Sequence, residues 1–336
     1  MDKIETNTQE RLPQDALTPE EALRDSRAMS AIIKNIETVI RGKTTQVALT
    51  VLCLTAEGHV LIEDIPGVGK TSLVSALAKT IGCPYKRIQF TPDVMPSDVS
   101  GFSIYNQKSG EFEFRPGAAM SSIVLADEIN RASAKTQSAM LEIMEERQVT
   151  VDGMTYRMSS PYMVLATQNP IDSLGTYQLP EAQIDRFMVK LSLGYPDFKD
   201  ELSVVMGGKK AKTEIQSITG PALIQTLIRD CNRVTVSKLV SSYIVRIVAA
   251  TRTNAYLKLG ASPRGSIALY QLSRAYAMLQ GRNYVIPDDV KFLAPYVLAH
   301  RLILTQQAKN EKLDATQLVN TIVGQVVVPA ADRAGR

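Results

Sequence analysis

Short apolar runs separated by longer helical stretches dominate the first two-thirds of the chain. Four such runs occupy residues 60–62, 123–126, 163–166 and 188–189. Each run is too short for a core helix and is followed by polar or turn-forming residues, which is typical of strands buried on both faces. Because helical patterns lie between these runs, the sequence predicts an α/β fold with a parallel sheet flanked by helices.

The two ends of the chain carry other patterns. Residues 1–28 are polar and predict either a mobile lead-in or a short first helix, whereas a helical pattern begins at Met29. Past residue 194, apolar residues recur at spacings of three and four, which predicts a second, helical domain. We therefore divide the chain into a polar N-terminal lead-in (1–28), an α/β core (29–194) and a helical domain (195–336).

Composition narrows the class of protein. The 38 Lys and Arg residues exceed the 34 Asp and Glu residues by only 4, and no basic run stands out, so a nucleic-acid partner is not expected. The three cysteines and two histidines are too scattered to predict disulfides or a zinc site. The polar start carries no signal core and no stretch is long enough for a membrane helix, which favours a cytoplasmic protein without direct membrane insertion.

A glycine-rich loop follows the first apolar run and precedes a helical stretch. In such a loop the backbone N–H groups and the helix N-terminus surround a phosphate group. Lys70 can reach the terminal phosphates and the Thr71 hydroxyl can ligate magnesium. Asp64 stands where the general pattern GxxxxGK[ST] expects glycine, so this loop alone could also be an ordinary turn that caps a helix. The residues of the predicted phosphate site are Pro66, Gly67, Val68, Gly69, Lys70, Thr71 and Ser72.

An acidic pair at the end of the second run supplies the other half of a nucleotide site. Asp127 can hold magnesium, and Glu128 can act as the base that polarises an attacking water. An acidic pair in this position can also simply cap the next helix. The presence of the phosphate loop 57 residues earlier (127 − 70) disfavours that alternative. The third run ends at Asn169, whose amide could position the same water.

Three longer segments resemble the MoxR family of AAA+ ATPases, a member of the helix-2-insert group. They are FTPDVMPSDVSG, ADEINRASAKTQSAMLEIMEERQVTVDG and LPEAQIDRF, and the resemblance extends from about residue 30 to the end of the chain. It implies a P-loop NTPase AAA+ core with a five-stranded parallel sheet, a helical lid domain, and assembly into a ring, usually a hexamer. ATP and Mg²⁺ are the implied ligands.

The same resemblance implies roles for individual residues. Lys70 and Thr71 match the Walker A pair, and Asp127 and Glu128 match the Walker B pair. Asn169 matches sensor 1. Arg186 matches the arginine finger that reaches a neighbouring subunit's nucleotide, and Arg264 matches sensor 2. For either arginine the alternative is an ordinary surface or interdomain salt bridge.

Two hairpins are predicted within the α/β core. Residues 102–115 form one around Ser109-Gly110, and residues 148–157 form the other around Asp152-Gly153. The hairpins could contact a client protein. Alternatively, Phe112 and Phe114 could pack the first hairpin onto the core.

The leading functional hypothesis is an ATPase that remodels or matures a client protein. The family resemblance further suggests a partner with a von Willebrand factor A domain. The rival hypotheses are a nucleic-acid remodelling motor, which the near-neutral charge disfavours, and a nucleotide-gated scaffold, which would need neither Glu128 nor Arg186.

Overall fold

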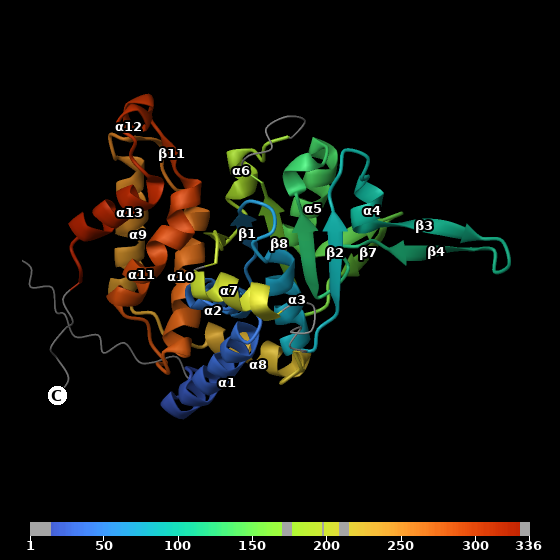
Figure 1. The fold of residues 1–336 in the computed structure, drawn as a ribbon, viewed down its shortest axis with the longest axis horizontal. Helices are drawn as coiled ribbons and strands as arrows, with labels where there is room; N and C mark the ends of the chain where they lie inside the picture. Colours follow the sequence, from blue (N-terminus) through green and yellow to red (C-terminus); the bar gives the residue numbers. More distant parts are fainter. Residues whose placement is uncertain (1–14, 170–176, 197, 208–214, 330–336) are drawn as a thin grey trace, which may run out of the picture.

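A five-stranded parallel sheet lies at the centre of the computed structural model, which describes residues 15–169, 177–196, 198–207 and 215–329 (Figure 1). The strand order is β2-β5-β8-β1-β9, so the predicted α/β class and the five strands are confirmed. The four predicted apolar runs form β1, β5, β8 and the start of β9, whereas β2 had no such signal. The strands are β1 (Val60–Glu63), β2 (Tyr85–Gln89), β5 (Ile123–Asp127), β8 (Met163–Gln168) and β9 (Val189–Leu191).

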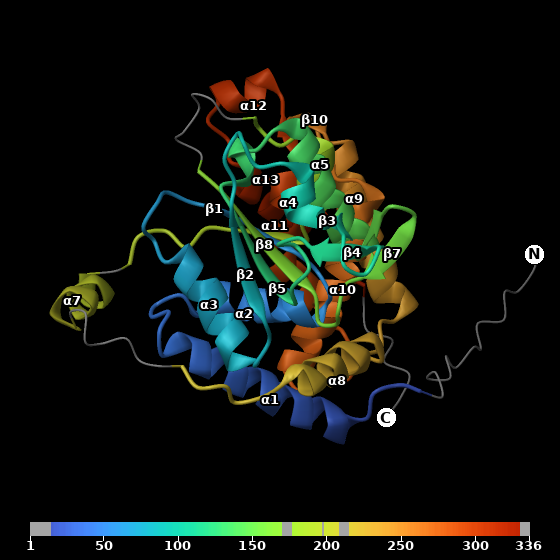
Figure 2. The ribbon, with the colours of Figure 1, turned by 90° about the vertical axis from the view of Figure 1, so that its right-hand side faces the viewer.

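Alternate residues of each strand enter two different hydrophobic cores. On β5, Ile123 and Leu125 face one core, whereas Val124 and Ala126 face the other. Helices α2 (Thr44–Thr55) and α3 (Lys70–Thr80) pack on the first face, and α4 (Pro96–Ser100) and α5 (Ala134–Glu146) belong to the second (Figure 2). The sheet is therefore buried on both sides, as its apolar runs require.

The first helix, α1 (Pro19–Glu37), begins inside the segment assigned to the lead-in. Thr18 and Glu21 form a capping box at its start, and Pro19 occupies the first helical position. Arg24 pairs with Asp230 at 2.7 Å, and the Ser26 hydroxyl donates to the Leu279 carbonyl, so α1 is fixed to the helical region. A helix therefore begins within the lead-in segment, but it continues to Glu37 instead of ending as a short helix, so the boundary at residue 28 falls within α1.

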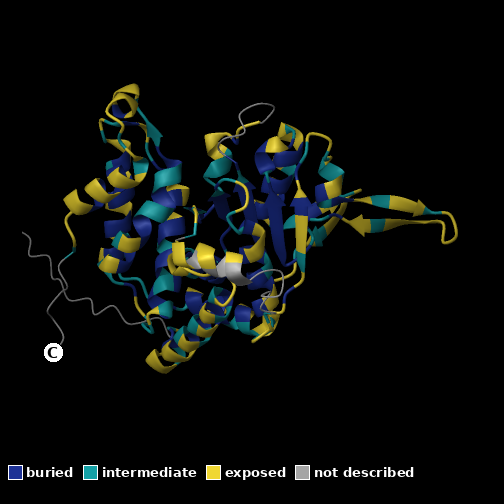
Figure 3. Cartoon of the chain, in the orientation of Figure 1, coloured by how far each residue is buried: buried dark blue, intermediate teal, exposed yellow. Residues whose placement is uncertain are grey.

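The described part of the C-terminal region is helical, with one short strand pair. Its hydrophobic core is continuous with the core on the α2–α3 face of the sheet, because residues such as Leu227, Val297 and Val319 belong to the same cluster as Ile62. Figure 3 shows the buried residues concentrated in the sheet and on the inward sides of the helices. No helix among the described residues is both long enough and apolar enough to span a bilayer. The remaining elements are η1 (Ile129–Arg131), α6 (Glu181–Ile184), α7 (Phe198–Gly207), α8 (Pro221–Asn232), α9 (Lys238–Arg252), β10 (Leu257–Leu259), α10 (Pro263–Leu279), α11 (Pro287–Leu298), η2 (Ala299–Arg301), β11 (Ile303–Leu304), α12 (Gln306–Asn310) and α13 (Ala315–Gln325).

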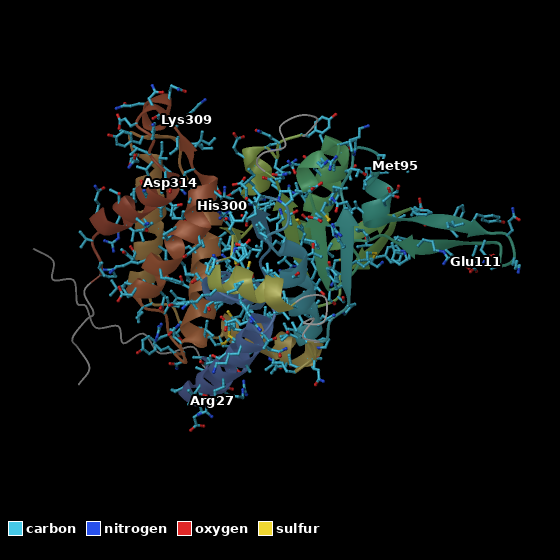
Figure 4. All side chains as sticks on the ribbon, in the orientation of Figure 1. Arg27, Met95, Glu111, His300, Lys309 and Asp314 are labelled. Carbon is cyan, nitrogen blue, oxygen red and sulfur yellow. The ribbon has the colours of Figure 1, made fainter. Side chains whose placement is uncertain are left out.

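Both predicted hairpins are present. Strands β3 (Gly101–Asn106) and β4 (Glu111–Pro116) extend away from the body of the molecule, with Glu111 towards the far end (Figures 1 and 4). Strands β6 (Gln148–Val151) and β7 (Met154–Arg157) turn at Asp152 and Gly153, both with positive φ.

The aromatic residues of β4 behave differently from one another. Phe114 stacks on Tyr156 of the second hairpin, with ring centroids 3.9 Å apart, and packs against the core of the α5 face. Phe112 is 72% exposed. The packing alternative is therefore right for Phe114 and wrong for Phe112.

Candidate active site

The glycine-rich loop connects the end of β1 to the start of α3. Gly67 and Gly69 have φ angles of +88° and +98°, which residues with a Cβ rarely adopt. A Cβ at either glycine would meet no other atom within 4 Å, so the backbone conformation, rather than lack of space, requires glycine. Thr71 and Ser72 lie exposed in the first turn of α3, which contains no acidic residue to neutralise the positive end of the helix dipole. Pro66 and Val68 complete the loop, and Val68 packs against the larger core.

Lys70 is buried at the head of α3. Its Nζ donates a hydrogen bond to the Asp64 carbonyl oxygen at 2.8 Å, so the side chain folds back over the loop. An ammonium group that is held beside a ring of backbone N–H groups is suited to binding phosphate oxygens.

Asp64, at the position of the missing glycine, has a structural role of its own. Its carboxylate accepts hydrogen bonds from the Leu193 and Gly194 N–H groups and from the Ser192 hydroxyl. These bonds fasten the chain after β9 to the start of the phosphate loop. Glycine could not make these contacts.

The acidic pair lies at the carboxyl end of β5 and is held in place by neighbouring side chains. Asp127 is buried, accepts a hydrogen bond from the Thr167 hydroxyl at 2.6 Å, and pairs with Arg87 of β2, whose Nε lies 3.0 Å from its Oδ2. Glu128 adopts a left-handed conformation (φ 55°, ψ 48°), and its N–H donates to Thr167 at 2.9 Å. The Glu128 carboxylate accepts hydrogen bonds from Gln89 at 3.1 Å and Arg131 at 2.9 Å.

Asn169 lies between these two parts of the site. It follows β8 directly and is buried. Because β8 separates β5 from β1 in the sheet, Asn169 stands between the acidic pair and the phosphate loop at the carboxyl edge. The sheet thus brings Lys70, Thr71, Asp127, Glu128 and Asn169 to one edge.

Arg186 and Arg264 lie elsewhere. Arg186 precedes β9, and Val189 of that strand pairs with Val60 at the start of β1, so Arg186 lies at the amino-terminal edge of the sheet. Arg264, at the start of α10, lies beside it, because both guanidinium groups contact Glu145 near the end of α5. Neither arginine joins the phosphate loop of its own chain.

The two arginines line a pocket of about 350 Å³ between the α/β core and the helical region. A buried ion pair between Arg301 and Asp185 lines one side of this pocket. Arg301, whose side chain is 2% exposed, donates from Nε to Asp185 at 2.8 Å and also donates to the Phe187 carbonyl. The Ser262 hydroxyl, which caps α10, donates to the other oxygen of Asp185 at 2.7 Å. Burial lowers the pKa of the Arg301 guanidinium, and the Asp185 carboxylate opposes that shift.

Sequence reasoning missed several residues that hold the site together. Arg87 and Gln89 lie on a strand with no apolar run, and Glu145, although it lies within the longest of the three quoted segments, was assigned no role from the sequence. Thr167 was visible only as part of a polar strand end. No cluster of three or more His, Cys, Asp or Glu among the described residues could hold a metal by itself.

Comparisons with known proteins agree with this arrangement. Residues 59–189 match the profile of the ATPase family associated with various cellular activities (AAA), and residues 249–322 match the AAA lid domain. The chain is 50% identical to protein YeaC of Bacillus subtilis over 306 residues, which cover 90% of this chain and 96% of the relative. It is 40% identical to the chaperone MoxR1 of Mycobacterium tuberculosis over 88% of this chain and 81% of the relative.

A solved structure supports the fold. A crystal structure of a candidate ATPase from Cytophaga hutchinsonii superimposes with a TM-score of 0.85 at 38% identity, and the match covers 93% of this chain and 98% of the other. The similarity therefore includes both the α/β core and the helical region.

Proposed function

Because the chain belongs to the MoxR family of AAA+ ATPases, we propose that it hydrolyses ATP between the subunits of a ring, in our proposal a hexamer. One observation carries this proposal. The phosphate loop and acidic pair occupy the carboxyl edge of the sheet, whereas Arg186 and Arg264 occupy the amino-terminal edge. A single chain therefore holds the two halves of a phosphoryl-transfer site apart, and a neighbouring subunit can supply the missing half.

In this proposal the carboxyl edge binds the nucleotide. The loop N–H groups and Lys70 hold the phosphates, and Glu128 orients the attacking water and accepts its proton. In this proposal the Asn169 amide holds the same water. Thr167 keeps Asp127 and Glu128 in register, because its hydroxyl bonds to the carboxylate of one and the N–H of the other.

The oxygen groups at this edge suit Mg²⁺. The Thr71 hydroxyl and the Asp127 carboxylate are hard oxygen ligands, and Mg²⁺ bound with a nucleotide needs few protein ligands because phosphates and water supply the rest. When bound, the ion would neutralise charge on the phosphate oxygens. The Asp127 carboxylate would exchange part of its contact with Arg87 for this role.

The arginines complete the site from the next subunit. Guanidinium groups stay charged and match phosphate oxygens in geometry, so Arg186 can stabilise charge on the transferring phosphoryl group. Arginine fingers supplied in this way contribute about 10³ to 10⁵ in rate in well-studied systems. Because Arg264 lies beside Arg186, we propose that it also acts on the neighbour's nucleotide rather than on its own.

The client-facing part of the proposal rests on the hairpins and the family. The β3–β4 hairpin extends from the body and exposes Phe102, Tyr105 and Phe112, which can contact a client protein. One relative is named a chaperone, which agrees with a remodelling role. The partner with a von Willebrand factor A domain follows from the family resemblance alone.

Two substitutions test the proposed reaction. Glu128→Gln should preserve ATP binding and stop turnover, and near wild-type turnover would exclude Glu128 as the base. Arg186→Ala subunits mixed with wild-type subunits should reduce hydrolysis more than dilution does, because each inactive finger disables a neighbour's site. A loss simply proportional to the fraction of variant would exclude a role between subunits.

A capture experiment tests the client hypothesis. The Glu128→Gln form held in ATP should retain its client in a pull-down, and replacing Phe102, Tyr105 and Phe112 by Ser should abolish that capture without changing ATP binding. Equal capture by this triple variant would remove the hairpin from the proposal.

A further inference from the structure

One carboxylate holds both arginines of the pocket. Glu145 Oε2 lies 3.1 Å from Arg186, and Glu145 Oε1 contacts Arg264. The side chain of Glu145 is 36% exposed, so it is accessible from the pocket rather than locked in a core. Two guanidinium groups from different parts of the fold, the core and the helical region, therefore converge on one group.

The side chains that line the pocket carry one more positive charge than negative charges, so the pocket can take up a further anion. Arg147 contacts Glu57, and Arg301 pairs with Asp185. The other two pocket arginines, Arg186 and Arg264, both contact the carboxylate of Glu145, so one negative charge serves two positive charges. The lining thus contains four guanidinium groups and three carboxylates: Arg147, Arg186, Arg264, Arg301, Glu57, Glu145 and Asp185.

The Arg186 side chain has hydrogen-bonding capacity to spare. Its Nε is buried and has no hydrogen-bond partner among the residues that the structure describes. A buried donor without a partner costs free energy that a further acceptor would recover. A phosphate offers several acceptor oxygens in place of the single one that Glu145 gives to Arg186.

We propose that Glu145 is a positioning residue that occupies the place of the neighbouring subunit's γ-phosphate until the ring closes. Its carboxylate keeps Arg186 and Arg264 side by side, and the γ-phosphate displaces it when ATP enters the shared site. This inference rests on the proposed function, because it requires the arginines to act between subunits. It predicts that Glu145 opposes ATP-driven assembly.

Glu145 should raise the ATP concentration needed for assembly only modestly. Partly exposed ion pairs are each worth little, so releasing two of them should change the ATP concentration for half-assembly by about 2-fold to 30-fold. In the Glu128→Gln background, which should bind ATP without turnover, adding Glu145→Gln should lower that concentration. Glu146→Gln is the matched control, since it removes the same charge from the next position of α5, which is exposed.

Sedimentation velocity during an ATP titration measures the effect, and an ADP titration tests its cause. ADP lacks the γ-phosphate, so Glu145→Gln should leave assembly in ADP unchanged. The inference is overturned if Glu145→Gln behaves like Glu146→Gln, if it raises the ATP requirement, or if it shifts ADP and ATP titrations equally. Thermal melting of each variant confirms that the fold is intact.

The failure of this inference can be told apart from failure of the proposed function. If Arg186→Ala subunits do not disable wild-type neighbours, the intersubunit site itself is wrong. If they do, yet Glu145→Gln leaves the ATP requirement unchanged, only the role of Glu145 is wrong.

Discussion

Acid should destabilise this protein through His59, and the geometry of that residue explains why. His59 is buried just before β1, where its Nδ1 accepts a hydrogen bond from the Val164 N–H at 3.0 Å. Its Nε2 lies 2.9 Å from the Met144 carbonyl oxygen and must therefore donate. The ring thus holds its proton on Nε2. A second proton on Nδ1 would oppose the N–H of Val164, so the folded protein needs the neutral imidazole.

The size of the effect follows from the pKa. Burial lowers the pKa of His59 from 6.5 to about 4. As pH falls below 6.5 the unfolded chain takes up a proton that the folded chain refuses, so stability is present above pH 6.5 and is lost towards pH 4. The linkage relation gives a loss of about 2 kcal/mol between about pH 7.5 and pH 5, with a ceiling of about 3 kcal/mol below pH 4.

Two measurements test this reasoning. The chain has only two histidines, so NMR of the imidazole Cε1–H signals with a His300→Gln variant assigns both. His59 should not titrate near 6.5. Urea unfolding of His59→Gln at both pH values should show a smaller loss of stability on acidification than the wild type, by about 2 kcal/mol. An unchanged loss, or a His59 midpoint near 6.5, would refute the argument. His300, partly buried where the helical region meets the core (Figure 4), also has a lowered pKa and contributes equally to both proteins.

Two further predictions concern residues outside the reaction itself. Asp64→Gly restores the general phosphate-loop pattern but should lower the melting temperature, because the N–H groups of Leu193 and Gly194 lose their acceptor at a cost of about 2 to 4 kcal/mol. Asp64→Asn keeps an acceptor and should lower the melting temperature less. A melting temperature for Asp64→Gly at or above the wild-type value would contradict the assigned contacts. Burial raises the pKa of Cys53, of Cys83 to about 11 and of Cys231 to about 12, so a thiol reagent at neutral pH should label the folded chain slowly and label all three cysteines in denaturant; fast labelling of the folded chain would contradict their burial.

The strands that could be predicted were those buried on both faces. A continuous apolar run marks such a strand, and all four runs lie in or beside β1, β5, β8 and β9. The edge strand β2 reads YKRIQ and buries only Ile88, so its sequence has no such run. Arg87 and Gln89, which contact Asp127 and Glu128, were missed for the same reason. An edge strand at an active site is difficult to predict because its polar side chains look like those of a loop.

Candidate site residues that belong to a local motif could be predicted, whereas residues that depend on tertiary contacts could not. The phosphate loop, the acidic pair and the Asp-Gly hairpin are encoded by adjacent residues, so their positions could be predicted. Glu145 lies within the longest segment that resembles the family, but it was assigned no role, because its partners Arg186 and Arg264 lie 41 and 119 residues later in the chain (186 − 145 and 264 − 145). The folding of α1 beneath the helical region likewise depends on distant partners such as Asp230.

The position of the arginine pair has a consequence for how hydrolysis could produce movement. Arg186 belongs to the α/β core and Arg264 to the helical region, and the Asp185–Arg301 ion pair joins those two parts immediately beside them. In the ring that we propose, one γ-phosphate contacts both arginines, so it fixes the helical region of one subunit relative to its own core and to the neighbour's nucleotide. Loss of that phosphate removes the contact with the neighbour but leaves the Asp185–Arg301 ion pair intact. The core and helical region should then move together as a rigid body, because they also share a continuous hydrophobic core. The movement that hydrolysis causes is therefore expected between subunits rather than within one.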